Sequence, residues 1–157
     1  MHTDSGAKMA ATKARKRKPA KGKARVERVS KGEATFAAIH KTTGKEAIER
    51  LRTIAPDFAD MIVNFAFGEI YARPGLDLRS RQIATIAALT ARGNAPAQLE
   101  AHIAGGLNLG LSQEEIREII MQMAVYGGFQ TAVNGLIVAQ AAFDKADKSA
   151  ATPRKRG

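Results

Sequence analysis

The sequence contains no cysteine, and this absence removes several kinds of chemistry. Without a thiol, the chain can form no disulfide, no thiolate metal site and no cysteine nucleophile. Histidine is also scarce: His2, His40 and His102 lie far apart and show none of the short spacings of zinc-binding motifs. We therefore expect no dedicated metal site.

Long apolar runs are missing as well. Glycine or a charged residue interrupts each apolar stretch before it reaches the length of about 20 residues that spans a bilayer. No apolar segment follows the basic N-terminus in the manner of a secretory signal. These absences predict a cytoplasmic protein that makes no membrane contact.

The positive charge is concentrated at the two ends of the chain. The formal net charge is +10, and residues 1–30 carry ten Lys or Arg against two acidic residues. Residues 149–157 add three basic residues, whereas residues 31–148 are close to neutral. Segments of like charge with few apolar side chains cannot offset the entropy of ordering. We therefore predict disordered basic tails over 1–30 and 149–157, and one folded domain over 31–148.

The N-terminal tail has more than one interpretation. It can act as an electrostatic arm for nucleic acid or another polyanion, although it lacks aromatic residues for stacking on bases. It can equally be a solubilising extension with no role in the domain's function. A mitochondrial presequence is a third interpretation, which the lack of regularly spaced large apolar residues disfavours.

The segment between the tails has helical periodicity and no alternation typical of strands. This pattern predicts an all-α fold. A short amphipathic segment over 30–40 precedes six expected helices, over 45–54, 56–71, 78–91, 94–110, 112–128 and 131–145. In two of these helices we expect the large apolar residues to face inward, namely Phe58, Met61, Ile62, Phe65 and Ile70 in 56–71, and Val133, Leu136, Ile137 and Phe143 in 131–145.

The two central helices carry the clearest local signals. Asn94 is the expected N-cap of the first, and Ser112 with Glu115 forms a capping box at the start of the second. Asp77 is the expected N-cap of the preceding helix, 78–91. The second helix has two apolar rows, one through Ile116 and Ile120 and another through Met121 and Val125. A helix that is apolar on two faces is buried on both, in a core or in a subunit interface.

Three segments carry a family resemblance: FGEIYARPGLDLRSRQ (67–82), QLEAHIAGGLNLGLSQEEIREIIMQMAVYGGF (98–129) and Asn134-Gly135. Through them, residues 46–143 resemble the carboxymuconolactone decarboxylase family, within the wider alkylhydroperoxidase-D-like fold. The resemblance implies a compact bundle of about six helices. It also implies assembly into a homo-oligomer, a trimer or a hexamer, with sites near subunit contacts.

The same resemblance implies a reaction. Oxidative-stress members of this fold use a C-x-x-C pair before the histidine, and the corresponding region here, 94–98, has no cysteine. Thiol-dependent peroxide reduction is therefore excluded. The decarboxylase branch implies cofactor-free loss of CO2 from a carboxylated unsaturated lactone such as 4-carboxymuconolactone, in the β-ketoadipate pathway of aromatic catabolism. Such an enzyme must bind carboxylates, stabilise an oxyanion and deliver a proton to carbon.

These tasks can be assigned to residues. His102 is the candidate general acid–base group, because the usual imidazole pKa lies near neutrality. Gln98 lies one helical turn earlier and can orient the ring or bond the oxyanion. The expected substrate-binding residues are three arginines that can grip carboxylates bidentately and a tyrosine that can close the pocket, namely Arg73, Arg79, Arg81 and Tyr126.

Each assignment has a structural alternative. His102 can be a hydrogen-bonded structural histidine, and Tyr126 can be a packing residue. Arg79 and Arg81 can pair on the surface with Asp77 or Glu69, and their spacing of two residues on a helix lets only one of them face inward. For Gly105-Gly106, a close contact between helices is preferred over a ligand site.

The chain also departs from the family pattern at three positions. Gln82 stands where many relatives have a glutamate, Gln130 stands where a proline is typical, and Glu100 occupies a position that is often basic or neutral. The first change removes a potential acid, and the others can alter the pocket mouth or an interface. A shifted substrate is one consequence, and a non-catalytic oligomer whose basic tails bind polyanions is the alternative function.

Overall fold

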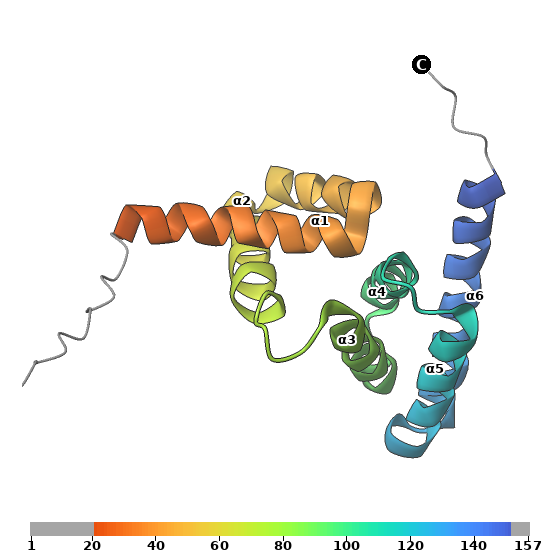
Figure 1. The fold of residues 1–157 in the computed structure, drawn as a ribbon. Helices are drawn as coiled ribbons and strands as arrows, with labels where there is room; N and C mark the ends of the chain where they lie inside the picture. The colour runs from red at the N-terminus through yellow and green to blue at the C-terminus, as the bar shows by residue number, and fades with distance from the viewer. Residues whose placement is uncertain (1–20, 152–157) are drawn as a thin grey trace, which may run out of the picture.

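The computed structural model describes residues 21–151, and within this range every element is a helix (Figure 1). The elements are α1 (Lys21–Ile54), α2 (Pro56–Met61), the π-helix η1 (Ile62–Tyr71), α3 (Leu78–Arg92), α4 (Pro96–Asn108), α5 (Gln113–Gly127) and α6 (Phe129–Ala151). The predicted all-α fold is confirmed. None of the described helices is both long enough and apolar enough to cross a membrane.

Helix α1 reverses its direction at Lys41, which has a non-helical backbone with φ 47° and ψ −140°. Figure 1 shows the long first arm of α1 and the shorter arm that returns beside it. The two arms correspond to the expected helical segments 30–40 and 45–54, so the break between them is confirmed. A residue other than glycine rarely adopts a positive φ, so the surrounding packing must hold Lys41 in this conformation.

The predicted tail boundaries are wrong where the structure describes them. Residues 21–30 belong to α1, and α6 continues to Ala151. Once the packed arm of α1 has nucleated a helix, each further residue adds a hydrogen bond at low cost, and Lys, Arg, Ala and Glu are strong helix formers. The expectations for residues 1–20 and 152–157 lie outside the described residues.

The predicted inward faces need correction. In α2 and η1 the buried residues are Ala59, Val63, Phe67 and Gly68. Four of the five residues predicted to face inward are instead 40–62% exposed, namely Phe58, Met61, Phe65 and Ile70. The wider π-helical winding of η1 changes which positions share a face, so a 3.6-residue periodicity selects the wrong set. In α6, Phe143 is buried as predicted, but Val133 and Ile137 are 48% and 66% exposed.

The helix caps agree with the sequence at two of the three predicted positions. The Asp77 carboxylate accepts a hydrogen bond from the Ser80 backbone N–H at 2.9 Å and caps α3. Ser112 and Glu115 form the reciprocal capping box of α5. The prediction for Asn94 is wrong, because the N-cap of α4 is Ala95 and no side chain caps this helix.

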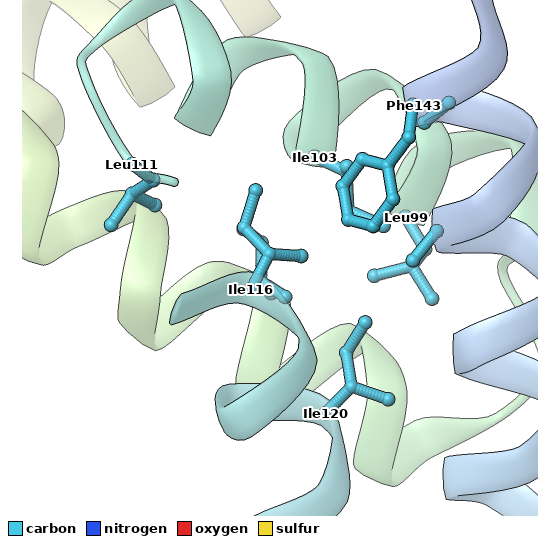
Figure 2. Packing of buried hydrophobic residues seen from close by; sticks show 9 residues of the cluster. Leu99, Ile103, Leu111, Ile116, Ile120 and Phe143 are labelled. Carbon is cyan, nitrogen blue, oxygen red and sulfur yellow. The ribbon is translucent and has the colours of Figure 1, made fainter. Parts of the chain in front are cut away.

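The main hydrophobic core lies between α3, α4, α5 and α6. Figure 2 shows Leu99 and Ile103 from α4 facing Ile116 and Ile120 from α5, with the Phe143 ring of α6 closing the cluster. Ile86 of α3 is fully buried in the same cluster. This core fixes α3 against α4, and these two helices carry most of the residues expected to form the site.

The close packing of α1 on η1 depends on Gly32. A Cβ atom at this position would overlap the backbone carbonyl oxygen of Val63, and a backbone group cannot move aside as a flexible side chain can. Gly75, by contrast, has no atom within 4 Å of the position where its Cβ would lie.

We predict that Gly32→Ala destabilises the fold, whereas Gly75→Ala does not. Overpacking at Gly32 outweighs the gain of about 1 kcal/mol in helix propensity, so the free energy of unfolding should fall by about 1–2 kcal/mol. Gly75→Ala should change it by less than about 0.5 kcal/mol. Urea unfolding followed by circular dichroism measures both, and equal effects of the two substitutions would contradict the close α1–η1 contact.

Candidate active site

His102 lies on α4, partly buried, with its ring directed toward α3. Its Nδ1 atom is 3.0 Å from Oε1 of Gln82, an amide side chain with no exposed surface. Because an amide oxygen only accepts hydrogen bonds, the ring donates from Nδ1, and Nε2 keeps its lone pair. The contact therefore fixes one neutral tautomer of His102.

A second imidazole packs against the first. The ring of His40, from α1, is buried, and its centroid lies 5.1 Å from that of His102 with the ring planes at 73°. Phe36 and Phe67 flank His40 on other sides, at centroid distances of 4.9 and 5.6 Å. The backbone carbonyl of Ala101 accepts a hydrogen bond from the His40 ring. His40 is thus packed among aromatic rings, with His102 on one side of it.

The backbone of α4 allows α1 to come this close. A Cβ atom on Gly105 would lie 2.8 Å from Cγ2 of Ile39 and 3.6 Å from Cε1 of His40. The Asn108 amide donates a hydrogen bond to the Ile39 carbonyl at 2.9 Å. The predicted role of Gly105 in a close contact between helices is confirmed.

Burial controls the charge of both histidines. Loss of solvation lowers the pKa of His40 to about 4, against the opposing effect of its bond to Ala101. Loss of solvation, and then the positive charge of His40, lowers the pKa of His102 to about 4. Both rings are therefore neutral at pH 7. The expectation of a His102 pKa near neutrality is wrong for the chain without substrate, because the sequence did not reveal how deeply the ring is buried.

Three other site residues predicted from the sequence lie on α4 and around the loop that precedes α3. Gln98 is exposed one turn before His102 on α4. Arg81 donates hydrogen bonds to the carbonyl oxygens of Leu76 and Arg73, at 3.0 and 3.2 Å, and so holds the loop that precedes α3. The Arg73 side chain is exposed on that loop.

Two expected interactions are different in the structure. Arg79 forms an ion pair with Glu115 of α5, a partner that the sequence did not indicate. Tyr126 is 75% exposed on α5, so within one chain it neither closes a pocket nor packs in the core. Glu100, one of the departures from the family pattern, forms an ion pair with Lys145 of α6.

A cavity of about 290 Å³ lies to one side of the histidine pair. It is lined by both arms of α1 and by Val63, and the Phe36 ring that contacts His40 forms part of its wall. His102 does not line this cavity. Among the described residues, no cluster of three or more His, Asp or Glu side chains could hold a metal ion.

Sequence reasoning missed His40 and the role of Gln82. Gln82 was recognised only as a departure from the family pattern, although it lies one turn before Ile86, on the buried side of α3. This spacing from Ile86 was the signal in the sequence that Gln82 is buried. For His40 the only hint was its place in an amphipathic segment beside Phe36 and Ile39. Its contact with His102, which lies far along the sequence, depends on the reversal at Lys41.

Comparison with known proteins identifies the family of the chain. Residues 56–141 match the model of the carboxymuconolactone decarboxylase family. The chain is 32% identical over 97 residues to 4-carboxymuconolactone decarboxylase of Acinetobacter baylyi, covering 62% of this chain and 72% of that relative. It is 32% identical over 101 residues to nitrosuccinic acid decarboxylase of Metarhizium robertsii, covering 62% of this chain and 70% of the relative.

An uncharacterized 15.0 kDa protein of Paracoccus denitrificans is 35% identical over 103 residues, covering 65% of this chain and 75% of that protein. The family match spans more than half of the chain and contains Gln82, Gln98 and His102. His40 lies before its first residue. The chain belongs to the carboxymuconolactone decarboxylase family.

Proposed function

We propose that this protein is a cofactor-independent decarboxylase of a small substrate that carries more than one carboxylate. Two relatives are named as decarboxylases, and their named substrates share a chemical feature. In 4-carboxymuconolactone an unsaturated lactone, and in nitrosuccinic acid a nitro group, can accept the electron pair left when CO2 departs. A substrate with such an internal electron sink needs no cofactor from the enzyme.

The observation that carries the proposal is the fixed tautomer of His102. Gln82 occupies Nδ1, so Nε2 is the atom that can take up and release a proton. The ring is only partly buried, whereas Gln82 and His40 behind it are buried. A substrate can therefore approach His102 from one side only, which orients the proton transfer.

The reaction can be written with this one proton. When the anionic substrate binds, its negative charge raises the pKa of His102, and Nε2 takes a proton from water. The carboxylate then leaves as CO2, and the electron pair of the broken carbon–carbon bond moves through the conjugated system to the carbonyl oxygen of the lactone. His102 delivers its proton to carbon and returns to the neutral state.

The remaining carboxylate needs a cationic partner. Arg81 uses Nε and one Nη group for the loop carbonyls and has further N–H donors for a bidentate contact. Arg73 is exposed on the same loop. Arg79 is the weaker candidate, because Glu115 already binds it, although an exposed pair of this kind contributes little and can be displaced. Gln98, exposed one turn before His102, is the proposed donor to the developing oxyanion.

Among substrates with this chemistry we favour a carboxylated unsaturated lactone. Its negative charge then matches the arginines near α3, and its carbonyl oxygen, where the oxyanion develops, matches the amide of Gln98. Turnover of such a lactone in the cytoplasm, within aromatic catabolism, is the pathway role that we propose with it. Gln82 and Gln130 differ from the family pattern, and such changes can shift the substrate. A related small dicarboxylic acid with an electron-accepting group is therefore the next substrate to test.

The assembly proposed for this enzyme is a homo-oligomer, a trimer or a hexamer. Phe129, Val133 and Ile137 follow each other at intervals of four on α6, and Val125 and Tyr126 lie on the neighbouring α5. We call these five residues the α5–α6 face. They are 48–81% exposed, and such a contiguous apolar surface is typical of an interaction site. A second copy of the chain is its proposed partner, and this contact would bury Tyr126.

We predict that His102→Gln lowers kcat for 4-carboxymuconolactone by about 10²–10⁴-fold, the usual contribution of a general acid. Substrate consumption is followed by ultraviolet absorbance and CO2 release. His2→Gln is the matched control and should leave kcat unchanged. If no lactone or nitro acid is turned over by the native chain, or if His102→Gln retains full activity, the proposed mechanism is wrong.

A second prediction concerns pH. With the carboxylates of the substrate ionised, productive encounter requires a proton on His102, whose pKa in the free enzyme is about 4. Above this pKa, kcat/KM should fall about tenfold per pH unit, while kcat stays level up to the raised pKa of the complex. Gln82→Glu places a carboxylate beside Nδ1, raises the pKa of His102 and should move the fall in kcat/KM to higher pH.

Ser149→Glu is the control for the pH experiment, because it adds the same charge at an exposed position of α6. Its profile should coincide with that of the native chain. A value of kcat/KM that stays constant between pH 5 and pH 8 in the native enzyme would exclude His102 as the proton donor.

The proposed assembly gives a third prediction. Phe129→Lys places a charge in the α5–α6 face and should convert the oligomer to smaller species, as measured by size-exclusion chromatography with light scattering. Val26→Lys is the matched control, because Val26 is a similarly exposed apolar residue, 70% exposed, outside this face. A native chain that is already monomeric would refute the proposed assembly.

A further inference from the structure

His40 belongs to a part of the chain that the family match does not include. It is contributed by the first arm of α1, whereas the matched residues begin at Pro56. Three contacts nevertheless place it on the segment of α4 that carries His102. Its ring meets the His102 ring edge to face, its N–H bonds the carbonyl of the preceding Ala101, and its Cε1 lies against Gly105.

We propose that His40 is a positioning residue for the decarboxylation, which holds the His102 ring in place and shares a single proton with it. This inference rests on the function proposed above, because it concerns the proton that His102 delivers. It assigns to α1 a part in the chemistry that the matched segment alone does not contain.

The geometry limits the pair to one proton at a time. Two imidazolium rings with centroids 5.1 Å apart, one of them packed between Phe36 and Phe67, would repel each other in surroundings that screen charge poorly. Protonation of either ring therefore opposes protonation of the other, and the two titrate as a coupled system.

The surrounding elements do not neutralise this repulsion. Helix α3 presents the neutral amide of Gln82, and α4 presents the carbonyl of Ala101. From η1, Tyr71 contacts Phe67, and its hydroxyl is hydrogen-bonded to Thr85. On α1, the residue after His40 is the exposed Lys41, which carries a positive charge.

Substrate binding decides which ring holds the proton. His40 is buried between Phe36 and Phe67, so an anionic substrate does not reach it. His102 is partly exposed, and Nε2 is its free nitrogen. The negative charge of the substrate therefore favours His102 over His40 as the ring that takes up the single proton from water. His40 supplies the alternative location and keeps the pair from holding a second charge.

The test is a titration of the histidine side chains by ¹⁵N NMR, which does not depend on catalysis. In the native chain we expect the signals of His40 and His102 to move together, each by only part of the full protonation shift, in the first step. In His40→Phe and His40→Gln, His102 should complete the whole shift in one step. Phenylalanine preserves the aromatic packing, and glutamine can preserve the hydrogen bond to Ala101.

Phe36→Leu serves as the control, because it alters the packing around His40 without removing a titrating group. It should keep the partial shifts of the native chain. Circular dichroism defines the pH range in which each variant is folded, and either His40 variant alone suffices for the comparison. The proposal is overturned if His102 shifts fully in one step in the native chain and does so unchanged in the variants.

Kinetics provide a second readout. Both His40 variants should lower kcat, by about tenfold, with KM changed less than twofold. Substrate contacts are kept, but each variant loses one of the two contacts, the ring packing or the hydrogen bond to Ala101, by which His40 positions His102. If the native chain turns over none of the proposed substrates, the proposed function fails, but the NMR titration still decides whether the two rings share a proton.

Discussion

The contact between α1 and α4 is the constraint on which the site depends. Gly105 provides the space for Ile39, and Asn108 ties the Ile39 carbonyl to the same helix. This close approach removes water from the adjacent imidazoles, and the loss of solvation lowers the pKa of both. A contact that contains few polar groups thus controls the protonation of His102, the proposed proton donor. The chemistry of His102 is therefore set by packing more than by charged neighbours.

Gln82 adds a second level of control without adding charge. A carboxylate at this position would stabilise the imidazolium form, whereas the amide fixes the tautomer and leaves the ring neutral. The buried Nε2 of the same amide has no hydrogen-bond partner among the described residues. Such an unsatisfied group costs free energy. Its presence beside His102 is consistent with a side chain retained for the site rather than for stability.

The sequence predicted the parts of the fold that depend on local patterns. The capping box of α5, the Asp77 cap and the all-α class follow from residues within one or two turns of each other, and they are confirmed. The inward face of η1 was predicted wrongly, because the π-helical winding depends on packing against α1 rather than on its own residue pattern. The start of α1 was also placed too late, since helix propagation overrides a charged composition.

The candidate site was predictable only in part, for a related reason. His102 and Gln98 belong to one helix, so their spacing of four residues was enough to predict that they lie on the same face. The pairing of His102 with Gln82 joins two helices, and the contact with His40 further requires the chain to reverse at Lys41. Neither a composition nor a periodicity contains this information. Apolar residues on the α5–α6 face illustrate the same limit, because their pattern indicates burial but not the partner that provides it.

The reversal at Lys41 also bears on how such a site can diverge. It places Ile39 and His40 of α1 against α4, although α1 lies outside the residues that the family model matches. A relative with the same residues in α3 and α4 but a different segment in place of α1 should therefore have a different pKa at the histidine that corresponds to His102. Sequence identity over α3 and α4 would then not reveal this difference in pKa between two such proteins.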